Sequence, residues 1–274
     1  MIDSRRTVKM TYQHITSRCF INFPFRRLQQ ELDFVLSHRI QPEIGLEGDT
    51  LYTATTAEYR EVAEALSKAG LRCTLHAPFF DLAPGALDEH ILAATRNKLG
   101  KAFDLIELFQ PVSVVCHLNY EEDKHGHKQA AWFNASLTTW QELLAKAVAH
   151  NVPLMLENTY ETGPEQHATM LSALDSPFAK FCLDVGHVTS FAKNSWQDWL
   201  PTLTPWLGQL HLHDNHGDRD AHLAPGRGSF DFSGLFGYLK EHRLQPIITL
   251  EPHTEDDLWE SLAALDRMRF FSTT

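Results

Sequence analysis

The stretch LGQLHLHD (207–214) combines an alternating apolar pattern with metal-binding side chains at its end. Because alternate residues of a strand face opposite sides, Leu210 and Leu212 share one face, and His211 and His213 share the other. We expect the leucines to pack against helices. The two histidines are then expected to point into the space that the sheet encloses.

The same pattern recurs along the whole chain. Seven other β-rich runs are present, and most of them also end in a histidine or a carboxylate: 16–23, 42–48, 72–78, 112–118, 152–158, 178–185 and 246–252. Longer helical stretches separate them, for example 25–38, 56–70, 88–109 and 129–150. Eight strands that alternate with helices predict a (β/α)8 barrel. A length of 274 residues suits one such barrel, so we expect a single domain over residues 1–274.

Composition narrows the class of protein. The net charge of −11, from 24 Lys and Arg against 35 Asp and Glu, argues against binding through the phosphates of a nucleic acid. No apolar run approaches the roughly 20 residues that span a bilayer, and residues 1–13 lack the apolar segment of a secretory signal. The four cysteines are widely spaced and form no CxxC pair. We therefore expect a cytoplasmic protein with reduced thiols.

Side chains that favour metals stand at or just after the ends of most predicted strands: His76, His117, Glu157, Asp184, His187, His211 and Glu251. In a parallel barrel all these ends meet at one mouth. A single residue of this kind often forms only a hydrogen bond to a loop. Several carboxylates at one mouth would repel each other unless a cation held them. The mixture of oxygen and nitrogen ligands suits zinc, manganese or another first-row divalent ion.

The most specific segment is HLHDNHGDRDAHLAPGRGSFDF (211–232). Its His-Leu-x-Asp, Asp-x-His and Gly-x-Gly patterns occur together with LEN (156–158), LDVGH (183–187) and TLEP (249–252). In this order the motifs resemble those of the xylose-isomerase-like TIM barrels, which include sugar phosphate isomerases and epimerases and the endonuclease IV family. The resemblance covers nearly the whole chain. Its motifs are specific for fold and metal site, and much less so for substrate.

The resemblance implies a core metal site of Glu157, Asp184, His211 and Glu251. It also implies that Glu157 and Glu251 are the catalytic acid/base pair of a metal-dependent isomerase or epimerase, acting on a small sugar, sugar phosphate or related polyol. The endonuclease IV branch has a three-metal cluster, whose additional ligands match His76, His117, His187, Asp220 and His222. We therefore expect one to three divalent ions, with zinc and manganese favoured.

Two further functions remain open beside the isomerase or epimerase. An abasic-site endonuclease must hold a duplex and flip out a nucleotide, yet the predicted loops at 48–58 and 77–89 contain no lysine or arginine. Because these loops lack basic residues, we rank a metal-dependent phosphodiesterase second and do not expect nucleic acid as a partner. A catalytically silent barrel that binds a metal or ligand comes third, because the carboxylate and histidine positions are intact.

Substrate contacts are predicted only weakly. Arg219 and Arg227 could bind a phosphate or a sugar hydroxyl, although arginines on a Gly-rich loop are equally often exposed to solvent. Tyr120 and Tyr160 follow ligand-bearing strands and could form a wall of a sugar pocket, although aromatic residues there are as often packed in the protein. Exterior helices of such barrels often pair, which is compatible with a homodimer.

Overall fold

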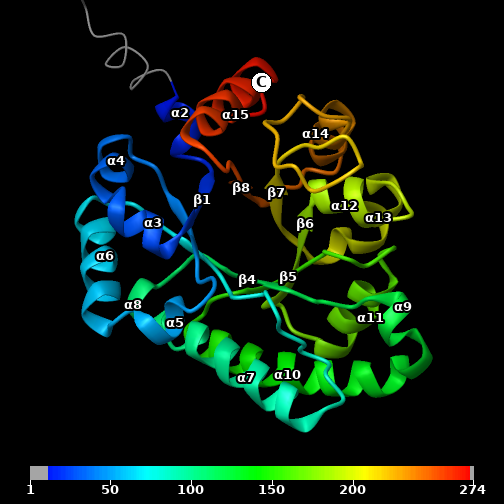
Figure 1. Ribbon diagram of the computed structural model, residues 1–274. Helices are drawn as coiled ribbons and strands as arrows, with labels where there is room; N and C mark the ends of the chain where they lie inside the picture. Colours follow the sequence, from blue (N-terminus) through cyan, green and yellow to red (C-terminus); the bar gives the residue numbers. More distant parts are fainter. Residues whose placement is uncertain (1–11, 272–274) are drawn as a thin grey trace, which may run out of the picture.

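The computed structural model describes residues 12–271, and within them eight parallel strands form a closed barrel (Figure 1). Each strand pairs with the next in sequence order, and β8 pairs with β1. The expectation of a (β/α)8 barrel is therefore confirmed. The strands are β1 (Phe20–Pro24), β2 (Pro42–Gly45), β3 (Thr74–His76), β4 (Val114–His117), β5 (Leu154–Glu157), β6 (Ala179–Asp184), β7 (Leu207–Leu212) and β8 (Ile247–Leu250).

Helices surround the barrel (Figure 1). Their bounds are α2 (Gln13–Thr16), α3 (Phe25–Gln30), α4 (Leu32–Ser37), α5 (Thr50–Thr53), α6 (Thr56–Lys68), α7 (Glu89–Phe103), α8 (Ile106–Phe109), α9 (Glu122–His125), α10 (Gln129–Ala149), α11 (Glu165–Leu174), α12 (Val185–Phe191), α13 (Trp196–Leu203), α14 (Phe232–Glu241) and α15 (Glu255–Arg267). Short 3-10 helices span Gly126–Lys128 and Thr204–Trp206. Among the described residues, no helix has the length and apolar character needed to cross a bilayer.

Strand alternation divides the apolar residues into two cores. Leu154 and Leu156 of β5 belong to the large core between strands and helices. Val115, Met155 and Cys182 form a small separate cluster. Because Met155 lies between the two leucines in the strand, it faces the opposite side, which is the barrel interior. The same alternation carries Glu157 to the inner face, as the sequence pattern predicts.

Several helix ends have local causes in the sequence. Thr55 and Glu58 form a capping box at the start of α6, in which Oγ1 of Thr55 accepts the N–H of Glu58 and the Glu58 carboxylate accepts the N–H of Thr55. Gly70 follows this helix at φ +65°, and Asn151 follows α10 at φ +59°. Both residue types tolerate the left-handed conformation that ends a helix. The carboxylate of Asp231 caps α14.

The first predicted strand is wrong at its beginning. Residues 16–23 were expected to be extended, but β1 begins at Phe20 and the short helix α2 precedes it. The carbonyl of Tyr12 accepts the N–H groups of Ile15 and Thr16, both at 2.9 Å, which closes a helical turn. Thr16 is therefore the last residue of a helix, and the strand contains only the second half of the predicted segment.

Candidate metal centre

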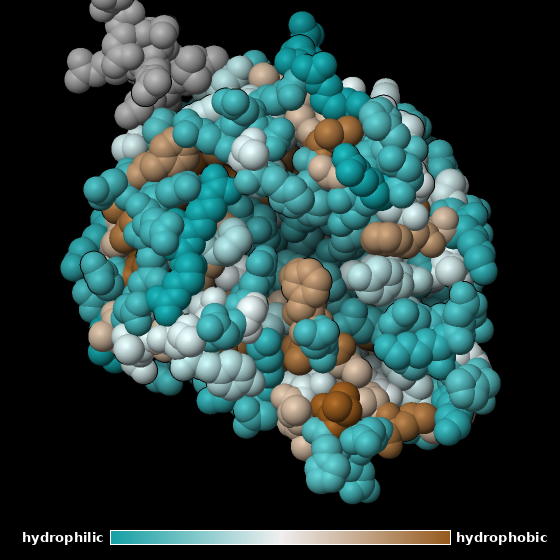
Figure 2. All heavy atoms as spheres, viewed as in Figure 1, coloured by the Kyte–Doolittle hydropathy of each residue, from teal (hydrophilic) through white to brown (hydrophobic). Residues whose placement is uncertain are grey.

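The carboxyl ends of the strands open into a pocket with a volume of about 910 Å³. Figure 2 shows a hollow near the centre of the face in view, with hydrophilic residues inside it. Histidines and carboxylates at the ends of β3, β4, β5 and β8 line the pocket, together with the loops that follow these strands. Part of its wall is aromatic and consists of Phe79, Phe80, Tyr160 and Phe191.

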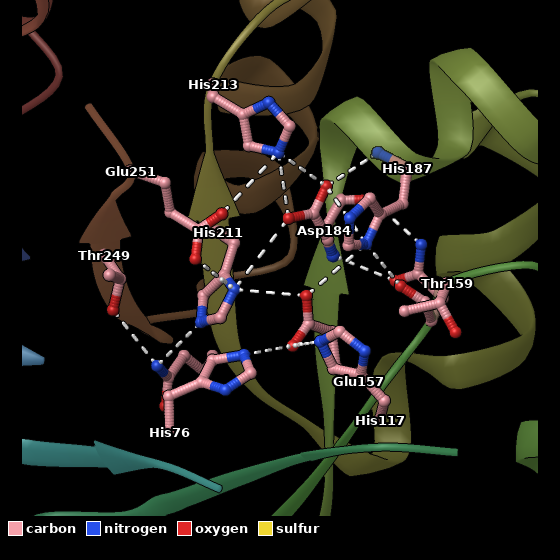
Figure 3. A network of polar contacts seen from close by, with 12 residues as sticks. His76, His117, Glu157, Thr159, Asp184, His187, His211, His213, Thr249 and Glu251 are labelled. Atoms are coloured by element: carbon pink, nitrogen blue, oxygen red, sulfur yellow. Dashed lines mark hydrogen bonds and ion pairs between the residues drawn. The ribbon is translucent and has the colours of Figure 1, made fainter. Parts of the chain in front are cut away.

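Four predicted ligands lie close together at the base of this pocket and form an inner group (Figure 3). Glu157 ends β5, Asp184 ends β6, His211 lies in β7, and Glu251 directly follows β8. Nδ1 of His211 lies 3.2 Å from Oε1 of Glu157, 3.1 Å from Oε1 of Glu251 and 3.8 Å from Oδ2 of Asp184. All four residues are buried.

The geometry of this inner group fits a divalent cation. Two ligand atoms that are each about 2.1 Å from a tetrahedral zinc ion lie about 3.4 Å apart, close to the contacts around Nδ1 of His211. That buried nitrogen also has no hydrogen-bond partner among the described residues, although carboxylate oxygens surround it. A cation that accepts the nitrogen lone pair and neutralises the carboxylates would satisfy all these atoms at once.

A second group shares Glu157 with the first. Nε2 of His76 lies 3.1 Å from Oε2 of Glu157, and Nε2 of His117 lies 3.3 Å from the same oxygen. The register of the sheet explains the proximity, because His117 pairs directly with Glu157 across β4 and β5. One atom from each of these three residues lies within 4.8 Å of the others, so this group could also hold an ion.

The third group gathers around Asp220 in the long loop after β7. Oδ2 of Asp220 lies 3.3 Å from Nε2 of His187 and 3.1 Å from Nε2 of His222. His187 is placed by the first turn of α12, where its backbone N–H donates to the side chain of Asp184. The structure therefore brings all nine predicted ligands together at one end of the barrel.

Negative charge dominates the electrostatics of the centre. Burial lowers the pKa of His76, but the hydrogen bond and charge of Glu157 outweigh this effect and raise it to about 9. Burial also lowers the pKa of His222, but the hydrogen bond to Asp220 outweighs burial and raises this pKa to about 9. Burial raises the pKa of Glu157, yet His211 and His117 bring it well below its ordinary value. Glu157 is thus ionised, as metal binding requires, and His76 and His222 would release protons on binding a metal.

Two buried residues of the centre were not assigned to it from the sequence. His213 was predicted to face inward, and its Nε2 lies 3.0 Å from both carboxylate oxygens of Asp184. Its ring stacks on His222 with centroids 3.9 Å apart. Glu43 in β2 is fully buried, with Oε1 3.1 Å from Nε2 of His211. The position of Glu43 in the extended run 42–48 was the one available signal, since it places this glutamate on the face opposite Ile44.

The four weakly predicted substrate contacts lie in different surroundings. Tyr160 lines the pocket and is half-exposed. Tyr120 does not, because its ring is buried against Trp132 and its hydroxyl donates to Glu122. Arg227 is exposed and forms an ion pair with Glu260. Arg219 is also exposed, and neither arginine lines the pocket. Of these four residues, Tyr160 is the one that lines the pocket.

The closed barrel and the ligands at the carboxyl ends of its strands define a class, the (β/α)8 barrels with a candidate divalent-metal centre at the catalytic face. Comparison with known proteins gives the family. Residues 33–271 match the model of the xylose isomerase-like TIM barrel, and the chain belongs to this family.

Similar solved structures include a D-tagatose 3-epimerase-like protein, with a TM-score of 0.80, 21% identity and coverage of 92% of this chain and 97% of that one. A Thermus thermophilus protein soaked with ZnCl2 has a TM-score of 0.77 and 22% identity, over 94% of this chain and 100% of that one. Among sequence relatives, a probable endonuclease 4 of Symbiobacterium thermophilum is 24% identical over 212 residues, which are 70% of this chain and 75% of the relative.

Proposed function

We propose that this protein is a divalent-metal-dependent isomerase or epimerase that moves a proton at the carbon next to the carbonyl of a small sugar or sugar derivative. One observation carries the proposal. Two buried glutamates, Glu157 and Glu251, meet at Nδ1 of His211 together with Asp184, at the base of an open pocket. This arrangement supports a candidate cation site with two candidate proton-transfer groups beside it.

The two glutamates approach from different parts of the barrel. Glu157 ends β5 and Glu251 follows β8, and β6 and β7 separate these strands. A cation bound by the inner group would act as a Lewis acid that polarises a neighbouring carbonyl, which makes the adjacent C–H more acidic. One ionised glutamate would then accept this proton. In an epimerisation the other glutamate, after taking up a proton from solvent, would deliver it to the opposite face of the same carbon.

The charges around the pocket support a neutral polyhydroxy substrate. Arg27 and Lys124 line the pocket, but Arg27 is paired with Glu31, and Lys124 with Glu121. Carboxylates also line it: Glu47, Asp81, Glu121, Glu157, Asp220 and Glu251. A phosphate group would therefore meet a mostly negative surface, whereas sugar hydroxyls can donate to carboxylates.

The apolar part of the pocket is also compatible with a sugar. Phe79 stacks on the ring of His117 with centroids 4.3 Å apart, and it contacts the exposed ring of Phe80. Tyr160 packs on Phe191 elsewhere in the same pocket. Aromatic faces at a binding pocket can cover the C–H face of a sugar ring. The likeness in fold to a D-tagatose 3-epimerase-like protein is in keeping with this substrate class.

The decisive test is proton exchange with solvent. The protein, loaded in turn with Mn²⁺, Co²⁺ or Zn²⁺, is incubated in D2O with a panel of ketoses and their phosphates, and mass spectrometry records deuterium at the carbon next to the carbonyl. We expect incorporation with at least one unphosphorylated sugar and its loss after chelation of the metal. If no sugar gains deuterium under any metal condition, the proposed reaction is wrong.

A metal-dependent phosphodiesterase is the second candidate. The observation that favours it is the presence of two further groups, around Glu157 and around Asp220, which give the centre the ligands for three ions. A relative named probable endonuclease 4 points the same way. Cleavage of an abasic DNA duplex, with three tightly held zinc ions per chain by elemental analysis, would support this function in place of the isomerase.

A further inference from the structure

A layer of polar side chains lies inside the barrel next to the metal centre. Five fully buried residues form it: Glu43, Thr74, Ser113, Gln209 and Thr249. Gln209 and Thr249 each stand two residues before a predicted ligand, so they share the inward face with that ligand. Interiors of such barrels are usually filled by branched apolar side chains. A buried carboxylate in this position requires partners, because an uncompensated buried charge is strongly unfavourable.

The two oxygens of Glu43 have different partners. Oε2 accepts hydrogen bonds from Thr74 at 2.8 Å, from Nε2 of Gln209 at 2.7 Å and from Thr249 at 3.1 Å. Ser113 fixes the direction of the Gln209 amide, because its hydroxyl donates to Oε1 of that residue at 2.7 Å. The barrel thus saturates Oε2 with neutral donors. Oε1 remains directed at His211, 3.1 Å from its Nε2. Nε2 of Gln209 also lies 3.3 Å from Nε2 of His211, but the two N–H groups of this amide have acceptors in Oε2 of Glu43 and Oγ1 of Thr249.

Both ring nitrogens of His211 face carboxylates, but on opposite sides of the ring. Nε2 faces Glu43, whereas Nδ1 faces Glu157 and Glu251 at the centre of the candidate site. A histidine binds a metal through a nitrogen without a proton, and the hydrogen bond made by the other nitrogen selects this form. A cation beside Nδ1 would neutralise Glu157 and Glu251, and the carboxylate of Glu43 would then keep the remaining ring proton on Nε2. The lone pair of Nδ1 is then available to a cation.

We propose that Glu43 is a positioning residue of the metal centre, which holds the proton of His211 on Nε2 so that Nδ1 can bind the metal. The inference rests on the metal site of the proposed function, but not on the reaction that the site performs. The neutral donors Thr74, Gln209 and Thr249 anchor Glu43 and thereby fix the orientation of the ring. Metal affinity, therefore, is the property that Glu43 should control.

The first test is Glu43→Gln. The amide can turn its NH2 group towards Nε2 of His211, which would move the ring proton to Nδ1 and block the metal. We expect Zn²⁺ or Mn²⁺ affinity to fall about 10–100-fold, as measured by competition with a chromophoric chelator. The visible spectrum of bound Co²⁺, which reports ligand geometry, should also change. Glu161→Gln is the matched control, because Glu161 is equally buried but is bound by the backbone N–H groups of Tyr120 and Thr159.

The second test uses the wild-type protein and does not depend on the folding of a variant. In ¹⁵N-histidine-labelled, zinc-loaded protein, NMR should detect the His211 proton on Nε2, with His211→Asn providing the assignment. Finding the proton on Nδ1, or unchanged metal affinity and Co²⁺ spectrum in Glu43→Gln, would overturn the role of Glu43. If the affinity falls as expected but no sugar exchanges deuterium, the role of Glu43 stands and only the proposed reaction fails.

Discussion

Glu157 contacts two parts of the candidate centre at once. Its Oε1 lies near Nδ1 of His211, whereas its Oε2 lies near both His76 and His117. Glu251 is placed differently, since its Oε1 approaches the same nitrogen of His211 from the end of β8, beside the third group. The two glutamates of the proposed acid/base pair should therefore differ in how much of the metal centre depends on them.

Glutamine substitutions should separate these roles. Glu251→Gln is expected to lower deuterium exchange about 10²–10⁴-fold, the usual contribution of a general acid or base, and to weaken metal binding in the inner group alone. Glu157→Gln should lower exchange at least as much and also reduce the metal content, because two groups of ligands lose a shared carboxylate. Exchange rates and elemental analysis of the same samples measure both effects.

Glu260→Gln provides a control for these substitutions, because Glu260 pairs with Arg227 away from the pocket. It should leave exchange and metal content at the wild-type level. Full exchange activity in both Glu157→Gln and Glu251→Gln would refute the assignment of these residues as the acid/base pair.

At the scale of elements, the junction of β6 and α12 requires a residue without a side chain. A Cβ atom on Gly186 would lie 1.9 Å from Cε1 of His213, far inside van der Waals contact. Gly186 stands in the first turn of α12, between Asp184 and His187. The close approach of this turn to β7 thus allows His213, Asp184 and His187 to meet.

Gly186→Ala should therefore damage both stability and the site. Overpacking typically costs about 1–3 kcal/mol, and the displaced His213 and His187 should weaken metal binding. Urea unfolding and metal competition measure the two effects. Gly237→Ala is the matched control. Outside the backbone of its own helix and its chain neighbours, no atom of residues 12–271 lies within 4 Å of a Cβ there, so the change in α14 should be neutral or stabilise by up to about 1 kcal/mol. A Gly186→Ala variant as stable as the wild type would contradict the clash.

At the scale of the whole molecule, one buried histidine outside the nine candidate ligands should contribute to acid sensitivity. His167 in α11 is fully buried, with its ring near Phe181 and Trp199. Burial lowers its pKa to about 4, although contact with Glu157 acts in the opposite direction. As the pH falls below 6.5, the unfolded chain binds a proton that the folded protein excludes. Folding stability should therefore decline between pH 6.5 and about pH 4.

The size of this effect follows from the same pKa. A decrease from 6.5 to about 4 corresponds to about 3 kcal/mol of unfolding free energy, lost across that interval as the pH falls. His167→Phe should remove this part of the pH dependence. Urea unfolding of both metal-free proteins at pH 7 and pH 4.5 tests it, because other titrating groups cancel in the comparison. Equal losses of stability in the two proteins would exclude His167 as the cause.

Much of the architecture could be predicted because its causes are local. The capping residues of α6, the left-handed Gly70 and the alternation in β5 depend on neighbouring residues, and the structure agrees with each. The beginning of β1 was missed because hydrogen bonds to Tyr12 close a helical turn in a segment that reads as extended. Loop residues were less predictable, since Tyr120 turns into the protein and Arg227 turns to Glu260.

Apart from Asp220 and His222, which only the resemblance to a known family indicated, the order of strands and helices, the inward faces of the strands and the candidate ligands at the barrel mouth follow from the amino-acid sequence. They do so because strand periodicity and parallel βα connections act over short distances. Only the tertiary structure decided that Glu43 of β2 meets His211 of β7, and that the nine side chains form three connected groups around Glu157 and Asp220. Such contacts span the barrel, and they depend on how the closed sheet sets the register of each strand and how packing directs each loop.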